Sequence, residues 1–197
     1  LGVKIKKKKT GKYVVYGKGL GSLFSKKNSS LNFGNSGTLA RLLVGILSTT
    51  PNIELRIEGD NSLNKRSMKK LVQLMSKFGA LFLPKNKFKF PLKIISSEIP
   101  VGINYKAGVS AQLKSAVMFA GLNSYGDTII EENEKSRDHT ENMLLKNSNV
   151  IKIKKGKRKT IRIFGKKKLI NSQIKVPGDP SSAAFIEFSK RLVISSR

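Results

Sequence analysis

The chain of 197 residues is strongly basic, with 39 Lys and Arg against 12 Asp and Glu and a net charge of +27, and 39% of its residues are hydrophobic. This hydrophobic content is sufficient for a packed core, and the length allows one large or two small domains. The absence of Cys excludes disulfides and thiol chemistry, and no apolar run reaches the length of a membrane span. These features leave the cellular compartment open, although a reduced cytosol fits, and we expect a cytoplasmic protein with no membrane partner.

The positive charge has two interpretations. A strongly basic chain can bind nucleic acid or an anionic surface. Here, however, only eight of the 39 basic residues are Arg, the Lys residues are scattered along the chain, and Trp is absent. Dedicated nucleic-acid surfaces favour Arg and interleaved aromatic residues. The scattered Lys residues thus favour a general compositional bias over a specific nucleic-acid partner. The electrostatic field of the positive charge would still attract small anions.

The N-terminal region predicts short strands followed by an apolar helix. Val3 and Ile5 mark a first strand, residues 12–16 a second, and residues 39–47 the helix. A turn punctuated by Gly, residues 31–38, precedes the helix and would let the backbone approach a ligand closely.

The next predicted unit is a strand over residues 53–60, whose apolar residues alternate, and a helix from about 65 to 78. Ser62 or Asn64 could cap this helix. Arg66 then falls in its first turn, where a cation is unfavourable beside the helix dipole unless an anion also binds there.

Strands over residues 92–97 and 101–105 lead to a helix that spans residues 111–122 and begins after Ser110, a preferred N-cap residue. The free N–H groups of a first turn favour a bound anion. Ser110, Gln112 and Lys114 would add a hydroxyl, an amide and an ammonium group there.

A further strand, residues 127–132, is followed by Arg137 and a helix over residues 138–146, with Ser136 or Asp138 as its cap. His139 is the only His in a chain without Cys, which argues against a metal site. Residues 150–154 and 160–164 predict a basic hairpin. A last strand, 173–176, precedes Pro177-Gly178-Asp179-Pro180, a break typical of a domain crossover.

Strand–turn–helix units therefore recur, and their turns carry Gly, Ser or Arg. Helix N-termini that converge with two or three Arg residues would form a site for a substrate with phosphate and carboxylate groups.

Five segments of the chain form an ordered set of motifs: residues 34–38 with Arg41, 59–68, 110–116, 136–141 and 176–185. Together and in this order they resemble the EPSP synthase (3-phosphoshikimate 1-carboxyvinyltransferase) family. The resemblance implies a mixed α/β fold, an inside-out α/β prism of repeated βαβαββ units with the helices inside. It also implies that residues 1–176 are one substrate-binding domain, truncated at its N-terminus, and that residues 177–197 are the crossover and the start of the second domain.

The same resemblance implies a transferase of the shikimate pathway, which leads to chorismate and the aromatic amino acids. The enolpyruvyl group of phosphoenolpyruvate would pass to the 5-hydroxyl of shikimate 3-phosphate, with release of phosphate and without metal or cofactor. The full-length enzyme is expected to be monomeric. No catalytic acid or base is expected in this chain, because those residues belong to the missing second domain, so the fragment should be inactive.

The resemblance also implies roles for particular residues. Asn35, Gly37, Arg66 and Gln112 would bind phosphoenolpyruvate. Ser110, Ala111, Gln112, Ser136 and Arg137 would bind shikimate 3-phosphate, so that Gln112 lies between the two substrates. The small Gly37 would also leave room for a longer analogue such as glyphosate.

Departures and alternatives remain. Ser67 stands where the family usually has Pro, and the residues after Phe185 are more polar than expected. The related UDP-N-acetylglucosamine enolpyruvyl transferase is one alternative, although its nucleophilic Cys has no counterpart here. A basic nucleic-acid-binding module is the other.

Overall fold

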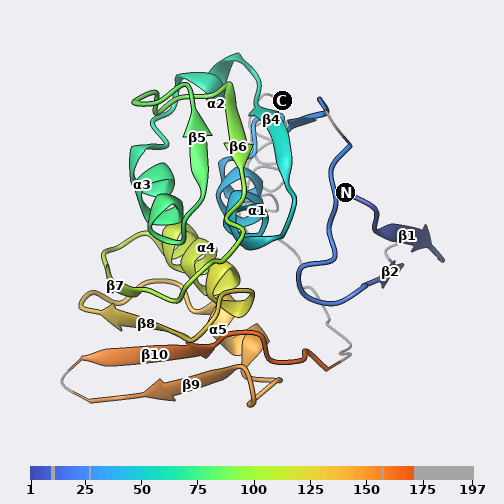
Figure 1. Cartoon of the computed structure of the whole chain (residues 1–197). Helices are drawn as coiled ribbons and strands as arrows, with labels where there is room; N and C mark the ends of the chain where they lie inside the picture. Colours follow the sequence, from blue (N-terminus) through green and yellow to red (C-terminus); the bar gives the residue numbers. More distant parts are fainter. Residues whose placement is uncertain (10–11, 27, 157, 171–197) are drawn as a thin grey trace, which may run out of the picture.

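The structure, a computed structural model, describes residues 1–9, 12–26, 28–156 and 158–170. Two four-stranded sheets enclose central helices, and a separate two-stranded sheet, β1 (Lys4–Lys7) and β2 (Tyr13–Tyr16), lies to one side (Figure 1). The predicted strand at residues 173–176 and the Pro177–Phe185 segment lie outside the described residues.

The first unit runs from β3 to β6. Its elements are β3 (Ser30–Asn32), α1 (Gly37–Thr49), β4 (Glu54–Glu58), α2 (Asn61–Lys65), α3 (Lys69–Lys77), β5 (Leu81–Leu83) and β6 (Leu92–Ile95). The sheet order is β3-β4-β6-β5, in which β3 and β4 are parallel and the remaining pairs antiparallel.

The second unit repeats this order of elements. It consists of β7 (Asn104–Ala107), α4 (Ala111–Leu122), β8 (Asp127–Glu132), α5 (His139–Leu144), β9 (Ile151–Lys154) and β10 (Lys159–Phe164). Its sheet order, β7-β8-β10-β9, matches that of the first unit, again with one parallel pair, β7 and β8. The predicted βαβαββ repeat and the predicted basic hairpin are therefore both present.

The helices α1 and α4 pack side by side in the centre and are parallel. Thr38 in the first turn of α1 contacts Gln112 in the first turn of α4, and at the other end Asn123, after α4, donates to the carbonyl of Thr49. Between these points Gly45 allows a close approach, because a Cβ on it would lie 2.5 Å from the carbonyl oxygen of Ala116.

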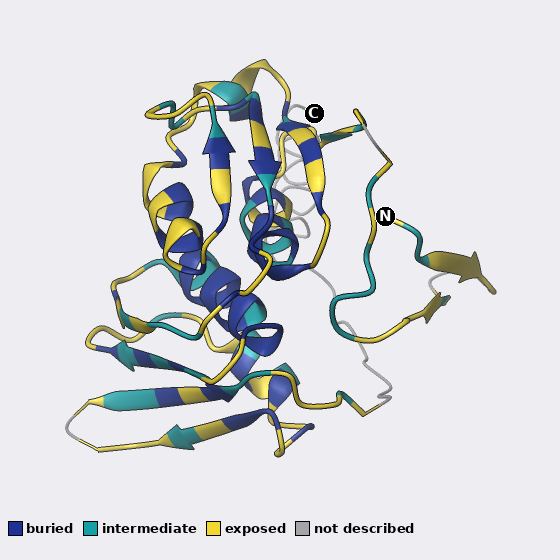
Figure 2. Ribbon diagram, viewed as in Figure 1, coloured by how far each residue is buried: buried dark blue, intermediate teal, exposed yellow. Residues whose placement is uncertain are grey.

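The buried core lies on and between these helices and the inner faces of the sheets (Figure 2). Met68 and Met75 belong to it, as predicted for apolar residues at helical spacing. Because both crossover helices start at one end of the molecule, the turns that precede them are brought to the same region.

Candidate functional site

The first turns of α1 and α4 form the centre of the candidate site. Their N-cap residues are Ser36 and Ser110, whose hydroxyl oxygens accept from the backbone N–H groups of Leu39 (3.1 Å) and Leu113 (3.4 Å). The prediction of a helix over residues 111–122 capped by Ser110 is thus confirmed. Neither first turn contains an acidic residue, so two positive helix ends face the same region without a protein anion in either turn.

Two guanidinium groups of the first unit lie beside Gly37. Arg41 donates from Nη1 to the carbonyl of Gly37 at 3.0 Å. A Cβ on Gly37 would lie 2.8 Å from Nη1 of Arg41 and 3.3 Å from Nη1 of Arg66. Burial, and then the neighbouring charge of Arg66, lower the pKa of Arg41. Within the described residues neither arginine forms an ion pair, so the pair is electrostatically suited to an anion.

The side chain of Arg66 is held in place by hydrogen bonds to two other side chains. Its Nη2 donates to Oδ1 of Asn35 (2.6 Å) and to the hydroxyl of Ser62 (3.3 Å). The turn before α1 and the start of α2 thereby fix the direction of this exposed side chain. Asn35 therefore orients Arg66 through its carbonyl oxygen, and this bond does not use its amide NH₂ group.

The predicted continuous helix from residue 65 is wrong. Asp60, not Ser62 or Asn64, caps the short α2 through a 2.7 Å bond from the N–H of Leu63, and Arg66 is the C-cap, with an extended backbone (φ −73°, ψ 139°). A separate helix then begins at Lys69. Arg66 therefore lies in a break between helices and not in a first turn.

The predicted residues of the second unit meet around Gln112. Ala111, Gln112 and Arg137 line a cavity of about 190 Å³ together with Ser115, Thr140 and residues of α1. Gln112 also lines a second cavity of about 490 Å³, whose lining includes Arg41 and Ser110. Its Nε2 donates to the hydroxyl of Thr38 at 2.7 Å, which leaves Oε1 available to accept. Gln112 thus stands between two hollows.

Two predictions for the second unit are wrong. The ammonium group of Lys114 is not offered to an anion, because this side chain is fully buried and ion-paired with Glu132 (2.7 Å) and Glu141 (2.6 Å). Ser136 does not cap α5 either, because its hydroxyl donates to Glu132 at 2.8 Å. Asp138 occupies the N-cap position but makes no capping hydrogen bond.

All eight predicted binding residues lie on the segments just described. Arg66, Asn35 and Arg137 are exposed, Gly37 is buried, and Ser110, Ala111, Gln112 and Ser136 are half-buried. The hydrogen bonds Asn35–Arg66 and Thr38–Gln112, the position of Arg66 beside Gly37, and the cavity shared by Gln112 and Arg137 join both units in one continuous surface.

The sequence did not reveal Glu132 as part of this region. A signal was present, because burial alternates along β8 and the buried positions are Thr128, Ile130 and Glu132. An acidic residue in the buried phase of a strand requires a partner, and Lys114 is the nearest one.

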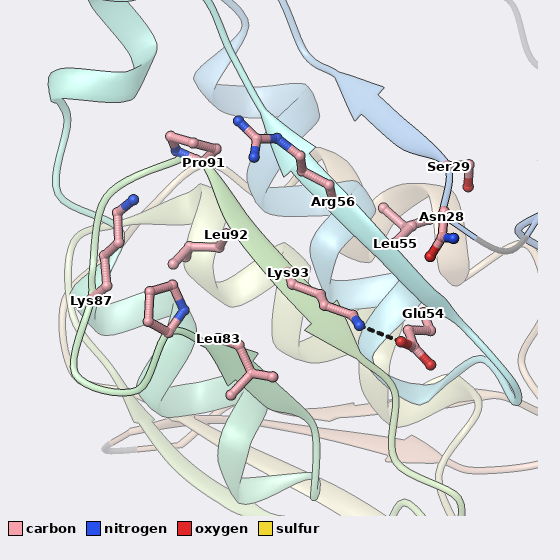
Figure 3. Close-up of a pocket in the computed structure, with 11 residues that line it drawn as sticks. Asn28, Ser29, Glu54, Leu55, Arg56, Leu83, Lys87, Pro91, Leu92 and Lys93 are labelled. Atoms are coloured by element: carbon pink, nitrogen blue, oxygen red, sulfur yellow. Dashed lines mark ion pairs between the residues drawn. The ribbon is translucent and has the colours of Figure 1, made fainter.

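Another cavity, of about 540 Å³, lies on the first sheet and contains none of the eight residues (Figure 3). Two of its three cations are already compensated, since Lys93 pairs with Glu54 and Arg56 pairs with Glu58 at 3.0 Å, and the third is Lys87. This cavity is therefore a weaker candidate for an anionic ligand.

The described residues contain no group of three or more His, Cys, Asp or Glu side chains placed to hold a metal ion. No helix in the described part of the chain is long and apolar enough to cross a membrane.

The profile of the family EPSP synthase (3-phosphoshikimate 1-carboxyvinyltransferase) matches residues 1–188. The chain belongs to the EPSP synthase family. Among curated relatives, the 3-phosphoshikimate 1-carboxyvinyltransferase of Paramagnetospirillum magneticum is 37% identical over all of this chain and 44% of its own length. That of Ruegeria sp. is 40% identical over 89% of this chain and 39% of its own length.

A solved EPSP synthase structure from Acinetobacter baumannii superposes with a TM-score of 0.79 at 37% identity, covering 93% of this chain and 41% of that structure. The predicted EPSP synthase family and fold are thus confirmed, and the alternative of a UDP-N-acetylglucosamine enolpyruvyl transferase is not favoured. The chain spans less than half the length of these EPSP synthases, in agreement with one domain of the two-domain fold.

Proposed function

We propose that this chain is the part of an EPSP synthase that binds shikimate 3-phosphate and one side of phosphoenolpyruvate. In the complete enzyme the enolpyruvyl group would pass to the 5-hydroxyl of shikimate 3-phosphate, in the cytoplasm and as a monomer. Residues 1–176 would be the substrate-binding domain, and residues 177–197 the crossover into the second. The observation that supports this best is the position of Gln112 between two hollows lined by arginines.

Phosphoenolpyruvate would lie over the first unit. Arg66, oriented by Asn35, would pair with its phosphate or carboxylate, because a guanidinium forms two charge-assisted hydrogen bonds with such a group. The missing side chain of Gly37 would leave room for this anion against the start of α1. Gln112 would contact it from α4.

Shikimate 3-phosphate would lie over the second unit. The hydroxyl of Ser110 accepts from Leu113 and can still donate its own proton. That hydroxyl, the backbone of Ala111 and the guanidinium of Arg137 would surround the phosphate, and Ser136 would stand beside them. The proton-transfer groups would come from the rest of the enzyme, so we expect no turnover from this chain alone.

Calorimetric titration with shikimate 3-phosphate tests this proposal, with shikimate as the ligand that lacks the phosphate. We expect saturable binding of the phosphorylated ligand only. Arg137→Met should lower the affinity by about 10- to 150-fold, since a charge-assisted contact is worth roughly 1.5–3 kcal/mol. Arg158→Met is the matched control, because it removes the same charge from an exposed turn. Equal losses in both variants would mean that only the overall charge binds the ligand, as the nucleic-acid alternative implies.

A further inference from the structure

Four charged side chains meet beneath the Ser136–Arg137 segment. Lys114 comes from α4, Glu132 from the end of β8, Glu141 from α5 and Lys159 from β10. Lys114, Glu132 and Glu141 are 3% exposed or less at their side chains, and Lys159 is 26% exposed. Two cations therefore compensate two carboxylates in a nearly dry environment.

The two oxygens of Glu132 have different partners. Oε1 accepts from Nζ of Lys114 (2.7 Å), from the backbone N–H of Ser136 (3.0 Å) and from the hydroxyl of Ser136 (2.8 Å). Oε2 faces Nζ of Lys159 at 3.0 Å. A single oxygen atom therefore joins the segment that carries Arg137 to the second turn of α4, where Lys114 follows Gln112 by two residues.

Stability alone does not account for this arrangement. Burial by itself raises the pKa of Glu132, but its bonds from Lys114, Ser136 and Lys159 lower that pKa to about 2, so the carboxylate stays charged. A buried ion pair can often be replaced by apolar residues without loss of stability, because desolvation offsets much of the attraction. What an apolar pair cannot supply is a directed acceptor for Ser136.

We propose that Glu132 is a positioning residue, which sets the Ser136–Arg137 segment against the first turn of α4. A phosphate-bearing ligand would then find Ser110 and Gln112 on one side and Arg137 on the other at a fixed separation. The inference rests on the proposed function for the identity of that ligand, but not for the geometry of the segment.

Two double variants separate positioning from stability. Lys114→Met with Glu132→Leu removes one charge of each sign and leaves the Glu141–Lys159 pair (3.2 Å) in place. Lys114→Met with Glu132→Gln removes the same charges but keeps a carbonyl oxygen that can accept from Ser136. Net charge is thus equal in the two variants, and thermal melting shows whether each is folded.

The first measurement is hydrogen exchange at the backbone amide of Ser136, without ligand. We expect exchange about tenfold faster in the Leu variant, as the loss of one hydrogen bond implies, and a rate close to that of the parent chain in the Gln variant. Similar exchange in both variants would overturn the proposal. If the Leu variant is unfolded, Ser136→Ala provides the test, since it removes the hydroxyl bond and should accelerate exchange at the amide of residue 136; an unchanged rate there would also contradict the proposal.

The second measurement is the affinity for shikimate 3-phosphate and for phosphoenolpyruvate. We expect the Leu variant to bind shikimate 3-phosphate about tenfold more weakly than the parent chain, and the Gln variant to bind it as the parent does. Neither variant should change its affinity for phosphoenolpyruvate. A Leu variant that binds shikimate 3-phosphate as the parent does would overturn the positioning role. If the parent chain itself does not bind this ligand, the proposed function fails, while exchange at Ser136 still decides the role of Glu132.

Discussion

In the first βαβαββ unit, Arg66 is fixed by neutral side chains on the surface, Asn35 and Ser62. In the second, the segment that carries Arg137 is fixed from below, through Ser136 and Glu132 to a buried lysine. The two arginines follow equivalent strands, β4 and β8, in units of one topology. The comparison shows that a repeated fold can bring two cations to one surface by two different means. The support below Arg137 contains charged groups and should respond to pH, whereas the partners of Arg66 are neutral.

Of the changes that distinguish the two units, removal of the buried Lys114 should have the largest effect on stability. Lys114→Ala leaves two buried carboxylates with only Lys159, so we expect the free energy of unfolding to fall by about 3–5 kcal/mol. Lys159→Ala removes the more exposed cation of the same network and should cost about 1 kcal/mol or less. Urea denaturation of both variants checks this, and equal losses would show that burial of Lys114 is not what distinguishes the second unit.

Acid should weaken the second unit selectively. The folded pKa of Glu132, about 2, lies below its ordinary value of 4.5, so the unfolded chain binds more protons between these values. The contribution of Glu132 to stability is therefore complete above pH 4.5 and disappears as the pH falls towards 2, a loss of about 3 kcal/mol. Urea denaturation between pH 7 and pH 2.5 measures it. Glu132→Gln should lack this part of the acid dependence, and an unaltered profile in that variant would contradict the assignment.

The two predictions above concern Lys114 and Glu132, whose burial and pairing were not predicted from the sequence. The pattern correctly placed Ser110 as a cap, α4 at residues 111–122 and β8 at residues 127–132, because caps and periodicity are local signals. Lys114 looked available because it stands near a helix start, but its burial depends on Glu132 and Glu141, which come from other elements. Such pairing cannot be deduced from one segment.

The first unit was predicted only in part, because β3 falls in residues that were predicted as a turn and β5 was not anticipated. Its arginine, its Gly turn and α1 were all anticipated, and α1 begins at Gly37, two residues before the predicted start. The break at Arg66 was not, because apolar spacing suggested one helix, whereas the cap at Asp60 stabilises an earlier, short one. The resemblance to the family supplied the ligand roles, which no local pattern contains.

The packing between the units should be sensitive to a single methyl group. In Gly45→Ala the new Cβ would lie 2.5 Å from the carbonyl oxygen and 2.9 Å from Cα of Ala116, so α1 and α4 would have to separate. We expect a loss of about 1–3 kcal/mol in thermal or urea unfolding. Gly17→Ala is the control, because no atom lies within 4 Å of its Cβ position. If both variants unfold alike, the helices are not in the close contact described.

A smaller effect is expected at Gly37, and on binding rather than on folding. A Cβ there would contact only the flexible ends of Arg41 and Arg66 at 3.3 Å or less, so the fold should tolerate Gly37→Ala. The displaced guanidiniums should weaken phosphoenolpyruvate binding by roughly tenfold, or ~1.4 kcal/mol. The affinity for the longer glyphosate should fall by a larger factor. Titration of both ligands checks this, and an equal loss for the two would contradict a steric role for Gly37.

The most direct test of a shared anion-binding surface is an amide NMR titration of the chain with shikimate 3-phosphate, followed by phosphoenolpyruvate. The account predicts that the first ligand shifts the amides of residues 110–112 and 136–137, and that the second shifts those of Asn35, Gly37 and Arg66. Shifts confined to the Lys-rich β1–β2 hairpin, or spread evenly over the basic residues, would contradict it.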